Sequence, residues 1–99
     1  MKKEVLIAEF LGTFFLIFFG CGAVVVDTLF GGDLGHLGIC IVFGLVVMAV
    51  IYSFGNVSGA HINPAVTIAL CFAGRFEPRL MPGYISMQLM GATSAALLL

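Results

Sequence analysis

Two long apolar runs carry almost no charge, and they restrict the possible folds more than any other feature. Residues 5–26 contain one charged residue, Glu9, and residues 39–54 contain none. At about 1.5 Å per residue, the first run reaches roughly 33 Å as a helix, enough to cross a bilayer core of about 30 Å. The whole chain has only nine charged residues among 99, whereas soluble domains have about 25%. We therefore expect most of the chain to lie in lipid.

The remaining residue types exclude several classes of function. The net charge of −1 provides no basic surface for nucleic acid. The three cysteines (Cys21, Cys40 and Cys71) are far apart and form no metal-ligand cluster with histidine. No nucleophile lies beside a base, so an enzyme is not expected. We expect no cofactor and no metal. A signal peptide is the alternative for the first run, but the run is long for one and lacks a plain cleavage site.

Polar loops alternate with the apolar segments. We expect an all-α membrane protein with three spans, at about residues 5–26, 37–54 and 84–99. Between the last two spans, a polar Gly-rich stretch precedes an apolar piece that begins at Pro64 and ends near Gly74. That piece reaches roughly 16 Å as a helix, or half a bilayer. Residues 55–74 therefore predict a re-entrant loop and half-helix rather than a full span.

The start of the half-helix is the most informative local pattern. Asn63 is a favoured N-cap and Pro64 suits the first helical position. Irregular backbone at membrane depth persists only where protein buries it or where it lines a wet cavity. A helix N-terminus at that depth presents partial positive charge and free N–H donors. Such a point can hold water or another neutral acceptor while it repels protons and cations.

Three strings in the chain resemble one family, the aquaporin (major intrinsic protein) channels. Ser58–Thr67 (SGAHINPAVT) resembles the first Asn-Pro-Ala box of these channels. Ala8–Leu16 (AEFLGTFFL) is similar to the opening of their first helix, and Gln88–Ala92 (QLMGA), with Tyr84 before it, to the start of their third. The resemblance covers essentially all 99 residues.

The resemblance implies a role for each residue of the box. By position, Asn63 donates hydrogen bonds to solute in mid-channel. The half-helix begins at Pro64 and Ala65. The loop before the box would line the pore with three backbone carbonyls, those of Gly59, Ala60 and His61.

Glu9 is the one charged residue inside a predicted span. In the family, a first-helix Glu supports the re-entrant loop from behind, and Glu9 fits that position. Independently, charges within the membrane nearly always face protein or water rather than lipid. The alternative is that Glu9 lies near the membrane surface and contacts water, because it is only about 7 Å into the run by helical rise.

Phe43 bears on the choice of solute. The narrow filter of the family takes an aromatic residue from the second helix, twenty residues before the box Asn, and that position is Phe43. A Phe there resembles the water-selective pattern, whereas glycerol facilitators tend to carry Trp. The alternative is that Phe43, one of ten phenylalanines, only packs between helices.

The basic residues predict an orientation. Lys2 and Lys3 precede the first span, and Arg75 and Arg79 follow the half-helix. The positive-inside rule places both pairs in the cytoplasm. We therefore expect a multi-pass protein of the cell membrane with a cytoplasmic N-terminus.

Residues 1–99 correspond to a single aquaporin-like repeat, whereas family channels contain two inverted repeats. We therefore expect the N-terminal half of a longer passive channel for water or another small neutral solute. The second repeat would come in cis or from a complementary half, and the complete channel would be a homotetramer. The alternatives are a genuine half-size channel, a glycerol-type facilitator, and a non-conducting subunit or interaction module that retains the scaffold.

Overall fold

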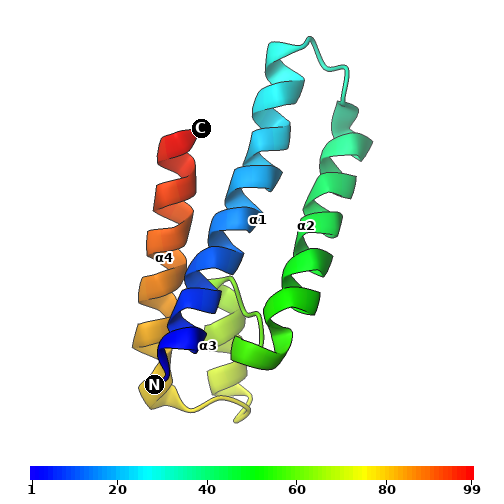
Figure 1. Cartoon of the computed structure of the whole chain (residues 1–99). Coiled ribbons are helices and arrows are strands. Elements are labelled where there is room, and N and C mark those ends of the chain that lie inside the picture. Colours follow the sequence, from blue (N-terminus) through cyan, green and yellow to red (C-terminus); the bar gives the residue numbers. More distant parts are fainter.

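The computed structural model describes residues 1–99 as helices joined by short loops, without a β-strand (Figure 1). The elements, in chain order, are α1 (Lys3–Leu29), α2 (Gly35–Ser58), α3 (Pro64–Phe72), the 3₁₀ helix η1 (Pro78–Leu80) and α4 (Met81–Leu98). Helix α1 lies in the middle, with α2 on one side and α4 on the other. The short helix α3 packs against α4 at the end opposite the α1–α2 loop (Figure 1).

Two of these helices, α1 and α2, are long and apolar enough to cross a membrane. Only 6% of the apolar window of α2 is buried inside the chain, so its apolar side chains need lipid or another protein surface to cover them. The predicted all-α class is confirmed. Helix α4 is less apolar than these two, and its place as a third span stays a prediction.

The two long helices α1 and α2 extend beyond the apolar runs from which they were predicted. Helix α1 continues past residue 26 through Asp27 and Thr28 to Leu29. In this last turn the Thr28 hydroxyl donates to the carbonyl of Val24. Helix α2 was expected to stop at residue 54, before the Gly-rich stretch, and this is wrong. It continues through Gly55 and Asn56 and ends at Ser58. Gly59 caps this end, with φ +85° and its N–H donating to the Gly55 carbonyl.

The last two helices also differ in their bounds. Helix α3 ends at Phe72, two residues before the predicted end. There Gly74 takes φ +74° and the Arg75 N–H donates to the Leu70 carbonyl, a Schellman ending that only glycine adopts easily. Helix α4 begins at Met81, three residues before the predicted start at 84, because Pro82 is tolerated in a first helical turn.

Glycines set the separation of the helices around α1. A β-carbon placed on Gly91 of α4 would lie 2.4 Å from the carbonyl oxygen of Phe10. One placed on Gly12 of α1 would lie 2.6 Å from Cγ2 of Ile62. The backbone of α1 therefore comes close enough to α4 and to the loop between α2 and α3 for side chains to connect them.

Candidate functional site

The site is organised around a carboxylate with no exposed surface. Glu9, in the second turn of α1, is 0% exposed and accepts four hydrogen bonds. Its Oε2 accepts from the Ser58 hydroxyl at 2.6 Å and the His61 N–H at 3.2 Å. Its Oε1 accepts from two further donors, the Ile62 N–H at 2.9 Å and Gln88 Nε2 at 2.8 Å. This burial excludes the alternative in which Glu9 contacts water.

The loop that Glu9 contacts, residues 59–63, has an uncommon backbone conformation. Ala60 has φ +49° and Ile62 has φ +47°, a region in which non-glycine residues are disfavoured. Such a conformation persists only when the surroundings hold it. Glu9 provides that hold, because its two oxygens accept from the N–H groups of two consecutive residues, His61 and Ile62.

The loop uses its donors internally and leaves its acceptors free. Each backbone N–H from Gly59 to Ile62 donates to a group of the chain: the first to the Gly55 carbonyl, the second to the Ser58 hydroxyl, the others to Glu9. None of the four carbonyl oxygens in residues 59–62 accepts a hydrogen bond from the chain. These four consecutive acceptors are therefore left without partners inside the chain.

Asn63 is the last residue of the loop, and its side chain provides a donor instead of an acceptor. Its side-chain Oδ1 accepts from the Ala65 N–H at 2.8 Å and caps α3. Pro64 is the first residue of that helix. Because the oxygen is used in the cap, the amide Nδ2–H₂ of this exposed side chain is left as a free donor. The α3 dipole adds partial positive charge at the same end.

A second layer of polar side chains holds the loop from the α3 and α4 sides. Gln88 Nε2 also donates to Thr67 Oγ1 at 3.0 Å, and Thr67 Oγ1 lies 2.9 Å from His61 Nδ1. The Tyr84 hydroxyl donates to the Ser58 carbonyl at 2.7 Å. Thr67, Tyr84 and Gln88 lie within the strings that resemble the family, but the sequence alone predicted no role for them. A polar residue inside an apolar run, such as Gln88 in the run after Tyr84, is the signal that identifies them.

The His61 side chain lies among aromatic rings rather than in a catalytic or metal-binding group. Its ring centroid is 4.8 Å from those of Phe76 and Tyr84, and these two rings are 4.6 Å apart. The imidazole is 7% exposed, so it fixes the loop while its carbonyl stays free of chain partners.

Phe43 lies apart from the other predicted site residues. Its ring packs over Gly20 of α1, where a β-carbon would approach Cε1 of the ring to 2.3 Å. By helical rise, Phe43 is about 22 Å along α2 from Ser58. The structure thus brings together Glu9, Gly59, Ala60, His61, Asn63, Pro64 and Ala65, and leaves Phe43 further along the molecule.

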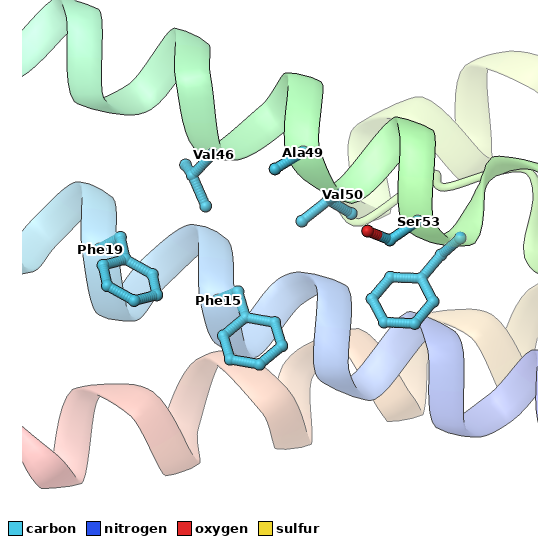
Figure 2. A pocket seen from close by; sticks show the side chains of 7 residues that line it. Phe15, Phe19, Val46, Ala49, Val50 and Ser53 are labelled. Atoms are coloured by element: carbon cyan, nitrogen blue, oxygen red, sulfur yellow. The ribbon is translucent and has the colours of Figure 1, made fainter.

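An open groove between α1 and α2 does not belong to this site. It has a volume of about 290 Å³, and Ser53 is its one polar lining residue (Figure 2). Phe15 and Phe19 of α1 face Val46 and Val50 of α2 across it. Without a line of polar groups, the groove suits a lipid chain or an apolar helix rather than a polar solute.

Comparison with known proteins agrees with this geometry. The family model described as major intrinsic protein matches residues 1–99, and the chain belongs to that family. Aquaporin NIP1-2 of Oryza sativa subsp. japonica is 52% identical over 100 residues, which cover 100% of this chain and 33% of the relative. Aquaporin NIP1-1 of Arabidopsis thaliana is 54% identical over 91 residues, or 92% of this chain and 31% of the relative. Aquaporin NIP1-1 of Zea mays is 48% identical over 91 residues, covering 92% and 32%.

Membership of this family confirms some of the predictions made from the sequence. The aquaporin resemblance is confirmed, and members of this family are membrane channels and not enzymes. The chain spans about a third of the length of the relatives it matches. The activity of a complete protein is therefore a matter for proposal.

Proposed function

We propose that residues 1–99 form the N-terminal repeat of a passive transmembrane channel for water or another small neutral solute. The observation that carries this proposal is the polarity of the Gly59–Asn63 segment. Four consecutive carbonyl oxygens, at residues 59–62, accept no hydrogen bond from the chain. They are followed by the side-chain amide of Asn63, whose oxygen is held in the cap of α3 and whose NH₂ group can donate. A permeating molecule therefore needs to donate along the loop and accept at Asn63. Water and small hydroxyl compounds do both.

The charge distribution favours neutral solutes. The one carboxylate near the loop, that of Glu9, accepts hydrogen bonds from four uncharged donors and has no exposed surface. The loop therefore offers a solute only dipoles. The positive end of the α3 dipole opposes a cation at Asn63. Free carbonyls oppose an anion along residues 59–62.

The remaining parts of the channel follow from the family. In this proposal α1, α2 and α4 are the three spans and residues 55–74 are the re-entrant element. The N-terminus is cytoplasmic and the channel lies in the cell membrane. The opposite wall of the pore comes from a second repeat, in cis or as a complementary half. The complete channel assembles as a homotetramer.

Phe43 is proposed as the bulky wall of the filter, and water as the preferred solute. The close contact with Gly20 supports a fixed ring position, which a size filter requires. A glycerol-type facilitator is the second candidate. Replacing Phe43 by Ala in the complete channel should increase glycerol uptake in a stopped-flow vesicle assay, whereas Phe30→Ala in the exposed α1–α2 loop should not. Equal glycerol uptake by the two variants would contradict the filter role.

Asn63→Asp provides the test of the channel function itself. The new carboxylate replaces the free Nδ2 donor with an acceptor and adds negative charge at the start of α3. In vesicles with the complete channel, we expect slower osmotic water flux or a measurable proton or cation leak. Asn56→Asp is the matched control, because Asn56 is exposed near the end of α2 and makes no side-chain hydrogen bond. Unchanged flux and unchanged leak in Asn63→Asp would contradict the mid-pore role.

Vesicles with residues 1–99 alone distinguish a half-repeat from a half-size channel or a non-conducting module. With one wall of the pore absent, we expect no fast, selective water flux. Fast flux would support a half-size channel instead. If the complete channel also fails to conduct, the non-conducting scaffold is the correct alternative.

A further inference from the structure

Two buried polar atoms have no partner in the chain, and they belong to two helices that pack against each other, α1 and α4. They are the hydroxyl oxygen of Thr13 and the side-chain oxygen Oε1 of Gln88. Thr13 is 4% exposed and Gln88 is 0% exposed. Buried polar atoms in proteins nearly always have a hydrogen-bond partner, which is either another protein group or an ordered water. These two atoms therefore point to a partner that the chain itself does not supply.

The orientation of the Gln88 amide leaves its oxygen in need of a donor. The Nε2 group donates to Glu9 Oε1 at 2.8 Å and to Thr67 Oγ1 at 3.0 Å. A reversed amide would turn its oxygen toward the Glu9 carboxylate, and two acceptors would then face each other. Because Glu9 fixes the position of the nitrogen, Oε1 is held on the other side of the amide and can only accept.

Thr13 lies beside the same part of α4. It is one helical turn after Glu9, so it shares the face of α1 that carries the carboxylate to which Gln88 donates. Three residues after Gln88, Gly91 comes against the carbonyl of Phe10. The α4 segment from Gln88 to Gly91 therefore packs along the turn of α1 that runs from Glu9 to Thr13.

The other buried residues of this part of the interface are too small to reach the two atoms. Gly91 and Ala95 are the next buried residues of α4, and Ala8 and Gly12 lie beside Glu9 and Thr13 on α1. None of these four has a polar side-chain atom. A common partner for the two atoms is therefore a small molecule that can donate to Gln88 Oε1.

We propose that one water molecule is bound between α1 and α4 by the Thr13 hydroxyl and Gln88 Oε1. Water can donate to Oε1 and can either donate to the Thr13 hydroxyl or accept from it. No direct hydrogen bond joins the two atoms, and polar groups that are too far apart for one are commonly bridged by water. Leaving two buried polar atoms unpaired costs more free energy than immobilising one water. Two polar partners are enough to hold a buried water.

This water is distinct from the molecules that the proposed channel would conduct. Both of its partner atoms are sealed between helices, so it does not exchange places with a permeating solute. It supports the Gln88 amide from the side opposite Glu9. Gln88 in turn donates to Glu9 and Thr67, which both contact His61 of the loop. The proposal does not depend on which solute passes.

The first test compares midpoints of thermal unfolding for variants of the 99-residue chain in micelles. Thr13→Val keeps the shape of the side chain and removes the hydroxyl. We expect its midpoint to be lower by about 4 °C or more, because the water loses one of its two partners. Thr93→Val is the matched control, since Thr93 is exposed on α4, and its midpoint should not change. If the Thr13 hydroxyl had no partner, its removal would leave the midpoint unchanged or raise it, and either result would overturn the proposal.

Two further measurements distinguish a shared water from other arrangements. In a Gln88→Met background, Thr13→Val should lose most of its effect, because the second partner of the water is already absent. An undiminished effect there would show that Gln88 does not share the partner of Thr13. A crystal structure of the complete channel should show an ordered water within hydrogen-bond distance of both atoms. A direct Thr13–Gln88 bond, or no water between them, would overturn the proposal even if the variants fold poorly.

Discussion

Replacing Glu9 by Gln tests whether the buried carboxylate holds the loop at residues 59–63. The substitution keeps the shape of the side chain but converts one acceptor oxygen into an NH₂ donor. On the Oε1 side, that NH₂ would face two donors, the Ile62 N–H and Gln88 Nε2. On the Oε2 side, it would face the Ser58 hydroxyl, which can accept, and the His61 N–H, which cannot. The second orientation costs less and leaves one buried N–H without an acceptor.

The expected cost follows from these contacts. An unpaired buried donor costs about 1–3 kcal/mol, and hydrogen bonds to a charged group are stronger than neutral ones by about 1 kcal/mol. The loop itself makes two of these bonds, so the unpaired His61 N–H and the weakened Ile62 bond together cost it about 2–4 kcal/mol. Since about 1.4 kcal/mol corresponds to a tenfold change in an equilibrium constant, the smaller figure corresponds to about 25-fold more frequent opening of the loop.

Hydrogen exchange at individual amides measures this opening. In the 99-residue chain in micelles, we expect the His61 amide of Glu9→Gln to exchange at least about 25-fold faster than in the unaltered chain. The control is Glu4→Gln, which removes an exposed carboxylate from the first turn of the same helix. Equal His61 exchange rates in the two variants, with unchanged helix content, would refute the role of Glu9 in holding the loop.

Two further substitutions test the contacts around the loop. Gly12→Ala places a β-carbon 2.6 Å from Ile62, and we expect a loss of about 1–3 kcal/mol of stability from overpacking, measured by thermal unfolding in micelles. Gly44→Ala, with nothing within 4 Å of the new β-carbon, should not destabilise, and equal losses would contradict the argument. Tyr84→Phe removes the bond to the Ser58 carbonyl and should cost about 0.5–1.5 kcal/mol. Tyr52→Phe, which changes an 84% exposed side chain, should have no effect, and an equal effect would argue against the contribution of that hydrogen bond.

The sequence predicted the order of the helices because apolar run length and proline position act locally. The positions of the two long runs, and the start of α3 at Pro64, follow from patterns that need no tertiary contact. The end of α2 could not be predicted in the same way. Glycine and polar residues at 55–58 favour a break, yet Ser58 bonds to Glu9, and its carbonyl to Tyr84, which anchors the last turn as helix.

The candidate site was only partly accessible from the sequence. The motif located Glu9 and Asn63 by resemblance. The loop carbonyls can accept and the Asn63 amide can donate. This arrangement depends on backbone torsions, such as φ +47° at Ile62, which no local sequence pattern predicts. Gln88 donates to a residue 79 positions before it, a pairing that arises only when α1 and α4 pack together.

The distances along the chain between Glu9 and its partners have a consequence for biosynthesis. Its donors are 49, 52, 53 and 79 residues later in the chain, so α1 is made long before any of them. An uncompensated carboxylate in a membrane helix costs about 2.5–3.5 kcal/mol at the bilayer centre. Three of the four donors are made with residues 58–62, and the last, Gln88, is made with α4. The carboxylate is therefore fully hydrogen-bonded only once α1, the loop and α4 have all been synthesised and packed together.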